Sequence, residues 1–211
     1  MKLICDKNVA ARIMYRIFSI PRLLLVLYFK LDRWHRLPVG QKSYIKEVVR
    51  YLNKRETRNS VVEIGCGLCD ILKQLKYKNR TGYDCSTPVV NAVNWMNIFR
   101  LKTWMINIKQ FEFGVDSVVG KHDAVILCNW IHNVSQAKLN AGIRDIFVNN
   151  LTVEGVIVVD LCRSSGYKFK HTSDDIFSGL NGEICEFGSN HIDRRLVAIV
   201  NKRHDVRSAV I

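Results

Sequence analysis

After residue 60 the sequence alternates between short apolar runs and longer segments typical of helices. Strands are expected at residues 61–64, 80–84, 103–108, 123–128 and 155–161. Helices are expected at residues 41–53, 69–77, 87–98 and 135–150. Strands that are apolar along their whole length and are separated by helices are typical of a parallel sheet with both faces covered. The alternation therefore predicts an α/β protein.

The C-terminal part departs from this alternation. Residues 182–188 and 194–202 are two strand-like runs separated by the short polar segment SNHID, which predicts an antiparallel hairpin. A chain of 211 residues has room for one α/β domain and a modest extension. We therefore expect an extension at residues 1–40 and a single domain at residues 41–211.

The net charge of +13 is concentrated near the N-terminus. Residues 1–60 contain 14 Lys and Arg against 4 Asp and Glu, a balance of +10, which leaves 18 against 15, or +3, for the other 151 residues. Such asymmetry indicates an anionic neighbour: nucleic acid, a phospholipid surface or a phosphorylated substrate. The alternative is that these side chains are simply solvated.

The N-terminal segment mixes apolar and basic residues. Residues 9–20 can form an amphipathic helix, and Pro21 should end it or start another. The apolar run at residues 23–29 has seven residues, whereas about 20 are needed to span a bilayer. Arginines interrupt the apolar stretch, so a signal peptide is not expected. Two alternatives stay open: a helix packed over the domain, or a helix lying on an anionic membrane surface.

The seven cysteines are odd in number and lie mostly in apolar runs, which favours free thiols in a reducing compartment such as the cytoplasm. Cys66 and Cys69 have the C-x-x-C spacing of a redox site or half a zinc site. No second close pair exists, and the histidines are far apart in sequence. We therefore expect no metal site.

The segment VVEIGCGLCDIL, residues 61–72, places Gly65 and Gly67 directly after a buried strand. Glycine there lets the backbone turn sharply and lets a ligand approach it closely. Asp84 ends the next strand, 19 residues after Gly65, where a carboxylate can accept both hydroxyls of a ribose. The position after Cys69 is Asp70, which is poorly suited to a pyrophosphate. The loop is therefore expected to hold a nucleoside rather than a dinucleotide.

The segments EIGCGLC and GYD resemble the E/D-x-G-x-G-x-G motif and the following acidic residue of class I S-adenosylmethionine-dependent methyltransferases. The resemblance covers about residues 41–203. It implies a Rossmann-like, doubly wound, mostly parallel seven-stranded sheet with a C-terminal antiparallel hairpin, and S-adenosyl-L-methionine as cofactor. The positions it assigns to cofactor binding are Glu63, Gly65 and Gly67 at the methionyl part, Asp84 at the ribose, Asn107 and Ile108 at the adenine, and Asn129 near the methyl group. The acidic residue often found at the adenine is not expected in this chain.

The third glycine of that motif is replaced by Cys69, and we expect this residue to have an ordinary negative φ. The segment CNWIHN places Trp130 and His132 beside the transferred methyl group in the same comparison. His132 is the candidate general base. The alternative is a histidine that caps or packs at the start of the next helix. His35 is a second candidate base, and Tyr44 is expected to contact the cofactor or to pack.

The resemblance implies a methyltransferase, and its acceptor is expected to be a small molecule or a glycan-type group methylated on oxygen. The Asn/Asp-Pro-Pro-Tyr segment of enzymes that methylate exocyclic amines of bases is missing, and the body of the domain is close to neutral. Two alternatives stay open. One is an RNA methyltransferase that uses the basic segment for phosphate contacts, and the other is a non-catalytic binding protein that keeps the fold.

Overall fold

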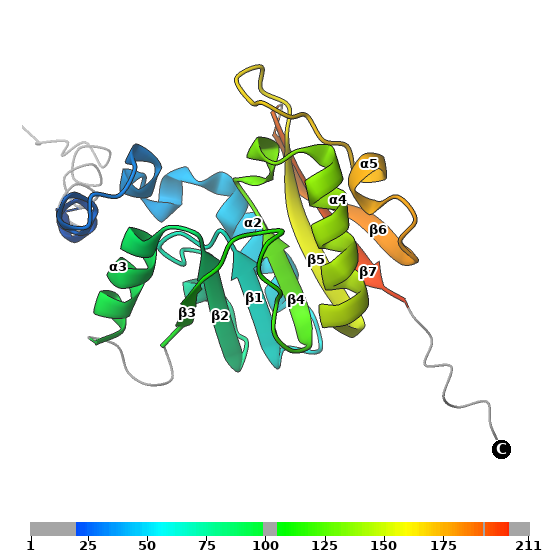
Figure 1. The fold of residues 1–211 in the computed structure, drawn as a ribbon, viewed down its shortest axis with the longest axis horizontal. Helices are drawn as coiled ribbons and strands as arrows, with labels where there is room; N and C mark the ends of the chain where they lie inside the picture. Colours follow the sequence, from blue (N-terminus) through cyan, green and yellow to red (C-terminus); the bar gives the residue numbers. More distant parts are fainter. Residues whose placement is uncertain (1–19, 99–104, 192, 203–211) are drawn as a thin grey trace, which may run out of the picture.

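A computed structural model describes residues 20–98, 105–191 and 193–202, and these form one seven-stranded sheet in the order β3-β2-β1-β4-β5-β7-β6 (Figure 1). The strands are β1 Ser60–Ile64, β2 Asn79–Asp84, β3 Asn107–Gln110, β4 His122–Leu127, β5 Leu151–Cys162, β6 Gly182–His191 and β7 Arg194–Asn201. The first five pair in parallel, and β7 pairs antiparallel with both β5 and β6. The predicted mostly parallel sheet with a C-terminal hairpin is confirmed.

The strand order places a switch point beside β1. From β1 the chain moves outward to β2 and β3, and then returns to β4 on the other side of β1. The crossover connections therefore diverge at the carboxyl ends of β1 and β4, which is where open α/β sheets bind ligands.

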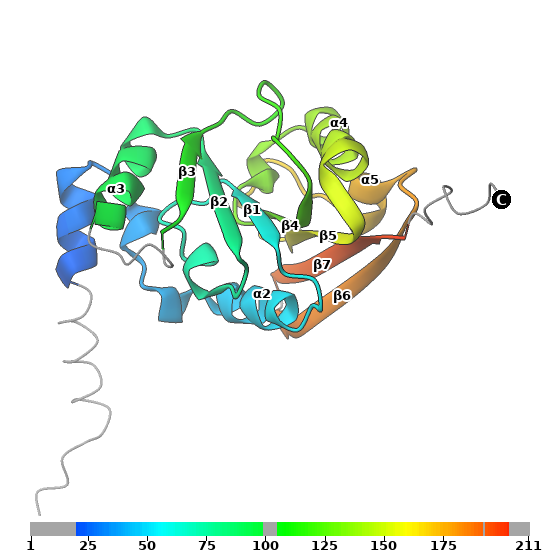
Figure 2. The same cartoon turned by 90° about the horizontal axis from the view of Figure 1, so that it is seen from below.

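Helices cover both faces of the sheet (Figure 2). They are α2 Ser43–Asn53, α3 Thr87–Ile98, α4 Gln136–Asp145 and the short α5 Ser173–Phe177, and α4 continues into a π-helical turn at Ile146–Asn150. Successive strand residues alternate between two cores, because side chains point to opposite faces of a strand. In β4, Ile126 packs in the core that contains α2 and α3, whereas Val125 packs in the core beneath α4.

Three sequence predictions differ from the structure. The helix expected at residues 69–77 is a series of turns with one 3-10 turn at Leu72–Gln74, because Cys69 adopts a left-handed conformation that a helix cannot continue through. The third strand was expected at residues 103–108 but is found at Asn107–Gln110, and residues 103 and 104 lie outside the described residues. Helix α5 was not predicted. The helix expected at residues 9–20 lies, except for its last residue, outside the described residues.

An N-terminal helix at residues 20–28 packs one face against the domain, and two 3-10 turns, η1 Arg33–Arg36 and η2 Val39–Gln41, connect it to α2. Its residues Leu25 and Val26 join the core that also contains Ile45 of α2. One face of the helix therefore packs over the domain, which was one of the two alternatives. The boundary expected at residue 40 between an extension and the domain stays a prediction. Within the described ranges, no helix has the length and apolar character required to cross a bilayer.

Candidate functional site

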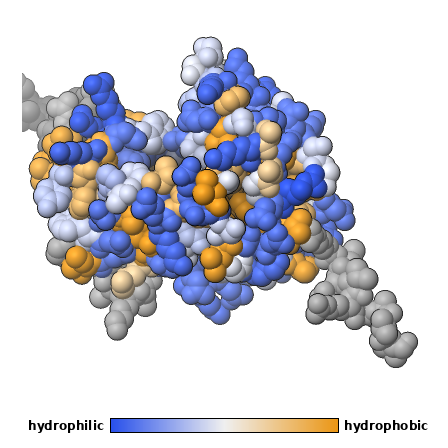
Figure 3. Space-filling model, in the orientation of Figure 1, coloured by the Kyte–Doolittle hydropathy of each residue, from blue (hydrophilic) through white to orange (hydrophobic). Residues whose placement is uncertain are grey.

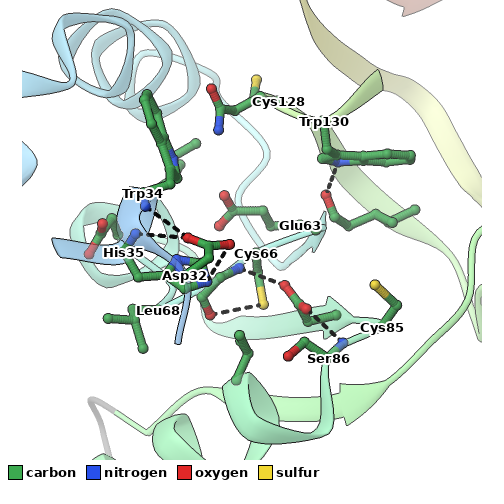
Figure 4. Close-up of a pocket in the computed structure, with 18 of the residues that line it drawn as sticks. Asp32, Trp34, His35, Glu63, Cys66, Leu68, Cys85, Ser86, Cys128 and Trp130 are labelled. Carbon is green, nitrogen blue, oxygen red and sulfur yellow. Dashed lines mark hydrogen bonds and ion pairs between the residues drawn. The ribbon is translucent and has the colours of Figure 1, made fainter. Parts of the chain in front are cut away.

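A pocket of about 770 Å³ lies where the chain leaves the carboxyl ends of β1, β2, β3 and β4, and η1 closes one side of it (Figure 4). This volume is within the range of small-molecule sites, about 300 to 1,000 Å³. Nine of the candidates named from the sequence line it: His35, Tyr44, Glu63, Gly65, Gly67, Asp84, Asn129, Trp130 and His132. Asn107 and Ile108 do not.

The loop after β1 needs its two glycines. Gly65 and Gly67 have φ of 70° and 50°, values that side chains rarely adopt. A Cβ on Gly65 would lie 2.4 Å from the Trp130 indole, and one on Gly67 would lie 3.0 Å from the His35 ring. The glycines therefore allow aromatic side chains from two other segments to close against the loop.

Cys69 also has a positive φ, 59°, so the expected negative φ is wrong. The third position of the motif requires the left-handed conformation in this chain too, and a residue with a Cβ adopts it at a cost of about 1–2 kcal/mol. The Cys69 side chain is fully buried and is not part of the pocket lining. Its Sγ lies 3.7 Å from that of Cys66, and both thiols are free. The thiol at position 69 therefore leaves the pocket open.

Asp84 joins the end of β2 to this loop. Its Oδ2 accepts a hydrogen bond from the Gly67 N–H at 2.9 Å, and its Oδ1 accepts one from the Ser86 N–H at 2.9 Å. Burial raises the pKa of Asp84, and these two backbone bonds counteract the rise. Each carboxylate oxygen retains a further lone pair that can accept a ligand hydroxyl.

Glu63 points into the middle of the pocket, between the side carrying Trp34 and His35 and the side carrying Trp130 (Figure 4). It is buried, and its Oε2 has no hydrogen-bond partner among the described residues. Burial raises the pKa of Glu63 well above its ordinary value. A buried acceptor without a partner is costly, so this oxygen is suited to a cationic or hydrogen-bond-donating group of a ligand.

Asn107 and Ile108 lie at the start of β3, paired with Thr81 and Gly82, and they are not among the residues that line the pocket. The strand extends to Gln110, so Phe111, Glu112 and Phe113 follow its carboxyl end and line the pocket. Glu112 is thus an acidic residue in the segment after the third strand, where none was expected. The segment QFEFG, residues 110–114, was the available signal.

The loop after β4 turns at Asn129, whose φ is 71°. Its N–H donates to Asp160 Oδ1 at 2.6 Å, and its Oδ1 accepts from Arg194 at 3.0 Å. Arg194 also pairs with Asp160 at 2.8 Å and lies over the Tyr44 ring, 4.4 Å from its centroid. Tyr44 lines the pocket and also packs against this cation. Sequence reasoning missed Asp160 and Arg194, which are far from Asn129 along the chain.

His132 lies in a 3-10 turn, Ile131–Asn133, on the same side of the pocket. Its ring is 3.9 Å from that of Tyr167, and its Nδ1 is buried with no hydrogen-bond partner in the described chain. Burial lowers the pKa of His132, which favours the neutral ring at pH 7. Trp130 beside it donates from Nε1 to the Ile64 carbonyl at 2.6 Å. His132 is therefore a neutral imidazole with a free nitrogen, next to an aromatic wall.

The turn η1 is fastened to the β1 loop by Asp70. Arg22 makes two hydrogen bonds to the Asp70 carboxylate, at 2.9 and 2.8 Å, and Lys42 Nζ makes a third at 3.1 Å. Burial alone would raise the pKa of Asp70, but the Arg22 hydrogen bonds and the nearby cations lower it to about 2. Arg22 Nε also donates to the His35 carbonyl, which places the His35 ring against Gly67. Part of the basic charge near the N-terminus is thus internal.

No group of three or more His, Cys, Asp or Glu residues is placed to hold a metal ion anywhere in the part of the chain that the structure describes. No protein-family model matches the sequence, and no curated protein matches it significantly.

Solved structures do match. Magnesium protoporphyrin IX methyltransferase (ChlM) from Synechocystis PCC 6803 with bound SAH matches with a TM-score of 0.62 and 14% identity, over 90% of this chain and 98% of that one. The N-methyltransferase NodS from Bradyrhizobium japonicum WM9 with S-adenosyl-L-homocysteine matches with a TM-score of 0.63 and 14% identity, over 86% and 98%. The glycopeptide N-methyltransferase MtfA with sinefungin matches with a TM-score of 0.58 and 13% identity, over 75% and 85%. The chain has the Rossmann-like fold of class I methyltransferases.

Proposed function

We propose that this protein is an S-adenosyl-L-methionine-dependent methyltransferase that methylates an oxygen of a small-molecule or glycan-type acceptor. The observation that carries the proposal is the buried, unpartnered Glu63 Oε2, which faces the same pocket as the two left-handed glycines and Asp84. A nucleoside with a cationic amino-acid chain matches this combination of groups. The adenosyl ligands bound to the similar structures support the same choice.

The residues present fit this cofactor. Glu63 would accept from its ammonium group, Asp84 would accept from the ribose hydroxyls, and the glycine loop would lie against the chain that joins them. The segment after β3 would meet the adenine, with Glu112 placed to accept from the exocyclic amine. Asn129 lies on the acceptor side and helps to close the pocket. When bound, the cofactor supplies a methyl group on a sulfonium, which is already a good leaving group.

The residues of the chain would then orient the acceptor and exclude water. Trp130 walls the pocket between the glycine loop and Phe113. His132 would accept the proton of the acceptor hydroxyl at Nδ1, the nitrogen that no described group occupies. The lowered pKa of His132 keeps this nitrogen unprotonated near neutral pH. His35 lies against Gly67 and is further from this role, because its ring contacts the cofactor loop.

An oxygen acceptor of small-molecule or glycan type is proposed on two grounds: the absent Pro-Pro-Tyr segment, and the nearly neutral charge of residues 61–211. Two similar structures are described as N-methyltransferases, so nitrogen is the competing acceptor atom. The RNA alternative is supported by the +10 charge of residues 1–60, part of which is exposed near η1. The two arguments for the non-catalytic alternative are weakened, because Cys69 is not part of the pocket lining and Glu112 is, on the side proposed for the adenine. The free cysteines in the described part fit the proposed cytoplasmic location.

The proposal is tested by methyl transfer from tritiated S-adenosylmethionine into cell extract divided into lipid, glycan, RNA, protein and small-molecule pools. We expect label in a pool of hydroxyl-bearing small molecules, glycans or glycolipids, and none with His132→Ala. Label in RNA that falls steeply with added salt would support the alternative acceptor. Absence of label from every pool would contradict the proposed activity.

A further inference from the structure

The outer face of the N-terminal helix is apolar and exposed. Leu25 and Val26 point into the core, whereas Leu24, Leu27 and Tyr28 expose 60%, 54% and 76% of their surface. Ile20 and Leu23 of the same helix are exposed as well. A nine-residue helix that buries one apolar face and shows a second is not explained by packing in the domain alone.

Helix α3 extends this surface. The two helices lie side by side in both ribbon views (Figures 1 and 2), and Phe29 contacts the Trp95 ring at 6.5 Å between centroids. Ile98, at the end of α3, is 73% exposed. No residue of α3 is charged. We call the exposed side chains of these two helices, Ile20, Leu23, Leu24, Leu27, Tyr28 and Ile98, the apolar end face (Figure 3, orange atoms at the left).

Exposed apolar residues elsewhere in the described chain are spread over separate elements. Val115 and Val119 lie in one loop, Val153 in β5 and Ile184 in β6. Single exposed apolar residues are normal on protein surfaces, whereas a contiguous group marks an interaction site. The apolar end face is such a group.

Basic side chains border the apolar end face. Lys30, Arg33 and Arg36 follow the helix directly and are exposed. One acidic residue, Asp32, lies among them, and it is engaged by the backbone N–H groups of Trp34 and His35. The surrounding sequence has the same sign, since residues 1–60 carry +10. A partner that covers this surface therefore needs an apolar layer next to negative charge.

We propose that the apolar end face lies in the interface of an anionic lipid bilayer, with Arg33 and Arg36 at the headgroups. An apolar layer bordered by phosphate groups is the chemistry of such a surface, and helices that lie in it combine an apolar face with Lys and Arg. A nucleic acid offers phosphates but nothing to cover Leu24 and Leu27. A helix of this length lies on a bilayer rather than crossing it.

This docking would set the acceptor class. The chain continues from the helix through Leu31 and Asp32 into η1, and residues 30–32, Trp34 and His35 line the pocket. A membrane under the apolar end face would therefore lie next to one wall of the pocket. This step depends on the proposed function: the hydroxyl that receives the methyl group belongs to an amphiphile held in the bilayer, such as a glycolipid or another lipid-anchored small molecule.

Flotation with vesicles tests the docking. We expect the full chain to bind vesicles of phosphatidylglycerol and phosphatidylcholine, and to bind pure phosphatidylcholine far more weakly. The double variant Leu24→Ser/Leu27→Ser should lower the partition coefficient about tenfold or more, since two apolar side chains no longer enter the interface. The matched control is Val119→Ser/Val153→Ser, which removes two equally exposed apolar side chains at the other end of the strands and should bind as the wild type does.

Charge is tested separately. Arg33→Gln/Arg36→Gln should lower binding to the anionic vesicles about 10- to 30-fold at 0.1 M salt. This is because each basic side chain near an anionic surface contributes about one kcal/mol to binding. The control Lys76→Gln/Lys78→Gln removes two exposed charges distant from the helix and should have little effect. Melting temperatures and S-adenosylmethionine binding are measured for every variant, to show that each is folded.

Absence of vesicle binding by the wild type, or equal loss in the controls, would overturn the docking. Light scattering provides a second test. A concentration-dependent dimer that is lost in the Leu24→Ser/Leu27→Ser variant would also overturn the docking, and would assign the apolar end face to a second copy of the chain. The two proposals fail separately. Vesicle binding without any binding of S-adenosylmethionine would remove the methyltransferase, and binding of S-adenosylmethionine without vesicle binding would remove only the docking.

Discussion

The loops that follow β1 and β4 both line the pocket, and both turn through a left-handed residue that is not glycine, Cys69 and Asn129. They are held in different ways. The first loop is fixed by neighbouring backbone: the Gly65 and Cys66 N–H groups bond to the Tyr83 carbonyl, and the Gly67 N–H bonds to Asp84. The second loop is fixed by side chains of the next two strands of the sheet, Asp160 of β5, which pairs with β4, and Arg194 of β7.

This difference bears on the two roles proposed for the pocket. The side proposed for the cofactor repeats a strand-loop-strand pattern in which adjacent segments satisfy each other, so its shape is encoded locally. The acceptor side depends on a buried ion pair that connects β5 and β7 to the loop. Substitutions at Asp160 or Arg194, which are distant from this loop along the chain, can therefore change its shape without changing the loop after β1. Substitutions on the two sides should therefore have different consequences.

The largest effect is expected from Asp160→Ala. Asp160 is fully buried and holds both Arg194 and the Asn129 N–H, so its loss would leave a buried cation without its partner. We expect the free energy of unfolding to fall by about 3–5 kcal/mol, measured by chemical denaturation. Asp174→Ala, an exposed carboxylate in α5, is the control and should change stability little. Equal effects of the two would mean that the acceptor loop does not depend on the ion pair.

His132→Ala should affect turnover rather than cofactor binding. A general base contributes about 100-fold or more to the rate, so turnover should fall by that factor while calorimetric affinity for S-adenosylmethionine is retained. Since burial lowers the pKa of His132, the wild-type rate should begin to fall only when the pH drops below the ordinary histidine value of 6.5. Unchanged turnover in the variant would remove His132 from the mechanism.

Asp70 gives the cofactor side a pH dependence. Its pKa is about 2 in the folded protein against 3.8 for the ordinary side chain. Because the folded value is lower, the stabilisation is present above pH 4 and is lost as the pH falls from about 4 to 2, by about 2 kcal/mol. Asp70→Asn should be less stable at pH 7 and should lose this part of the acid dependence. An identical acid profile in the two proteins would contradict the role given to the Arg22 and Lys42 contacts.

Asp84→Ala should weaken S-adenosylmethionine binding by about 1–3 kcal/mol, the cost of leaving ribose hydroxyls and two loop N–H groups without an acceptor. Calorimetry on a variant with a confirmed melting transition measures this. Wild-type affinity would show that the carboxylate does not hold the ribose.

The smallest effect is expected from Cys69→Gly. Relief of the left-handed strain, about 1–2 kcal/mol, is offset by the lost buried thiol and by the greater freedom of glycine in the unfolded chain. The net change in the free energy of unfolding, measured by chemical denaturation, should be within about 1 kcal/mol. Asn129→Gly is the comparison across the pocket: it also relieves strain but loses the hydrogen bond from Arg194, so it should destabilise the protein. Equal changes would mean that the two loops are held alike.

Much of the cofactor side could be predicted from the sequence, because Glu63, Gly65, Gly67 and Asp84 stand at the ends of two adjacent strands that the apolar runs reveal. The segment expected at the adenine was placed too early because the third strand was predicted to end at Ile108, whereas β3 extends to Gln110. An apolar run alone does not fix where a strand ends.

Long-range pairs could not be predicted. Asp70 pairs with Arg22 across 48 positions, and Asn129 pairs with Arg194 across 65, and no periodicity in a single sequence links such residues. The helix expected at residues 69–77 failed for a similar reason. Leu68, Ile71 and Leu72 gave an apolar pattern suited to a helix, but the left-handed turn at Cys69 packs the same side chains into the core as a compact loop.

The most direct test is a calorimetric titration of the purified chain with S-adenosylmethionine. The account predicts saturable heat at one site, competition by S-adenosylhomocysteine, and a clear loss of affinity in Glu63→Gln, which removes the charge that faces the cofactor ammonium group. No heat and no rise in melting temperature at millimolar cofactor would contradict it, since the pocket beneath Glu63 would then serve another ligand.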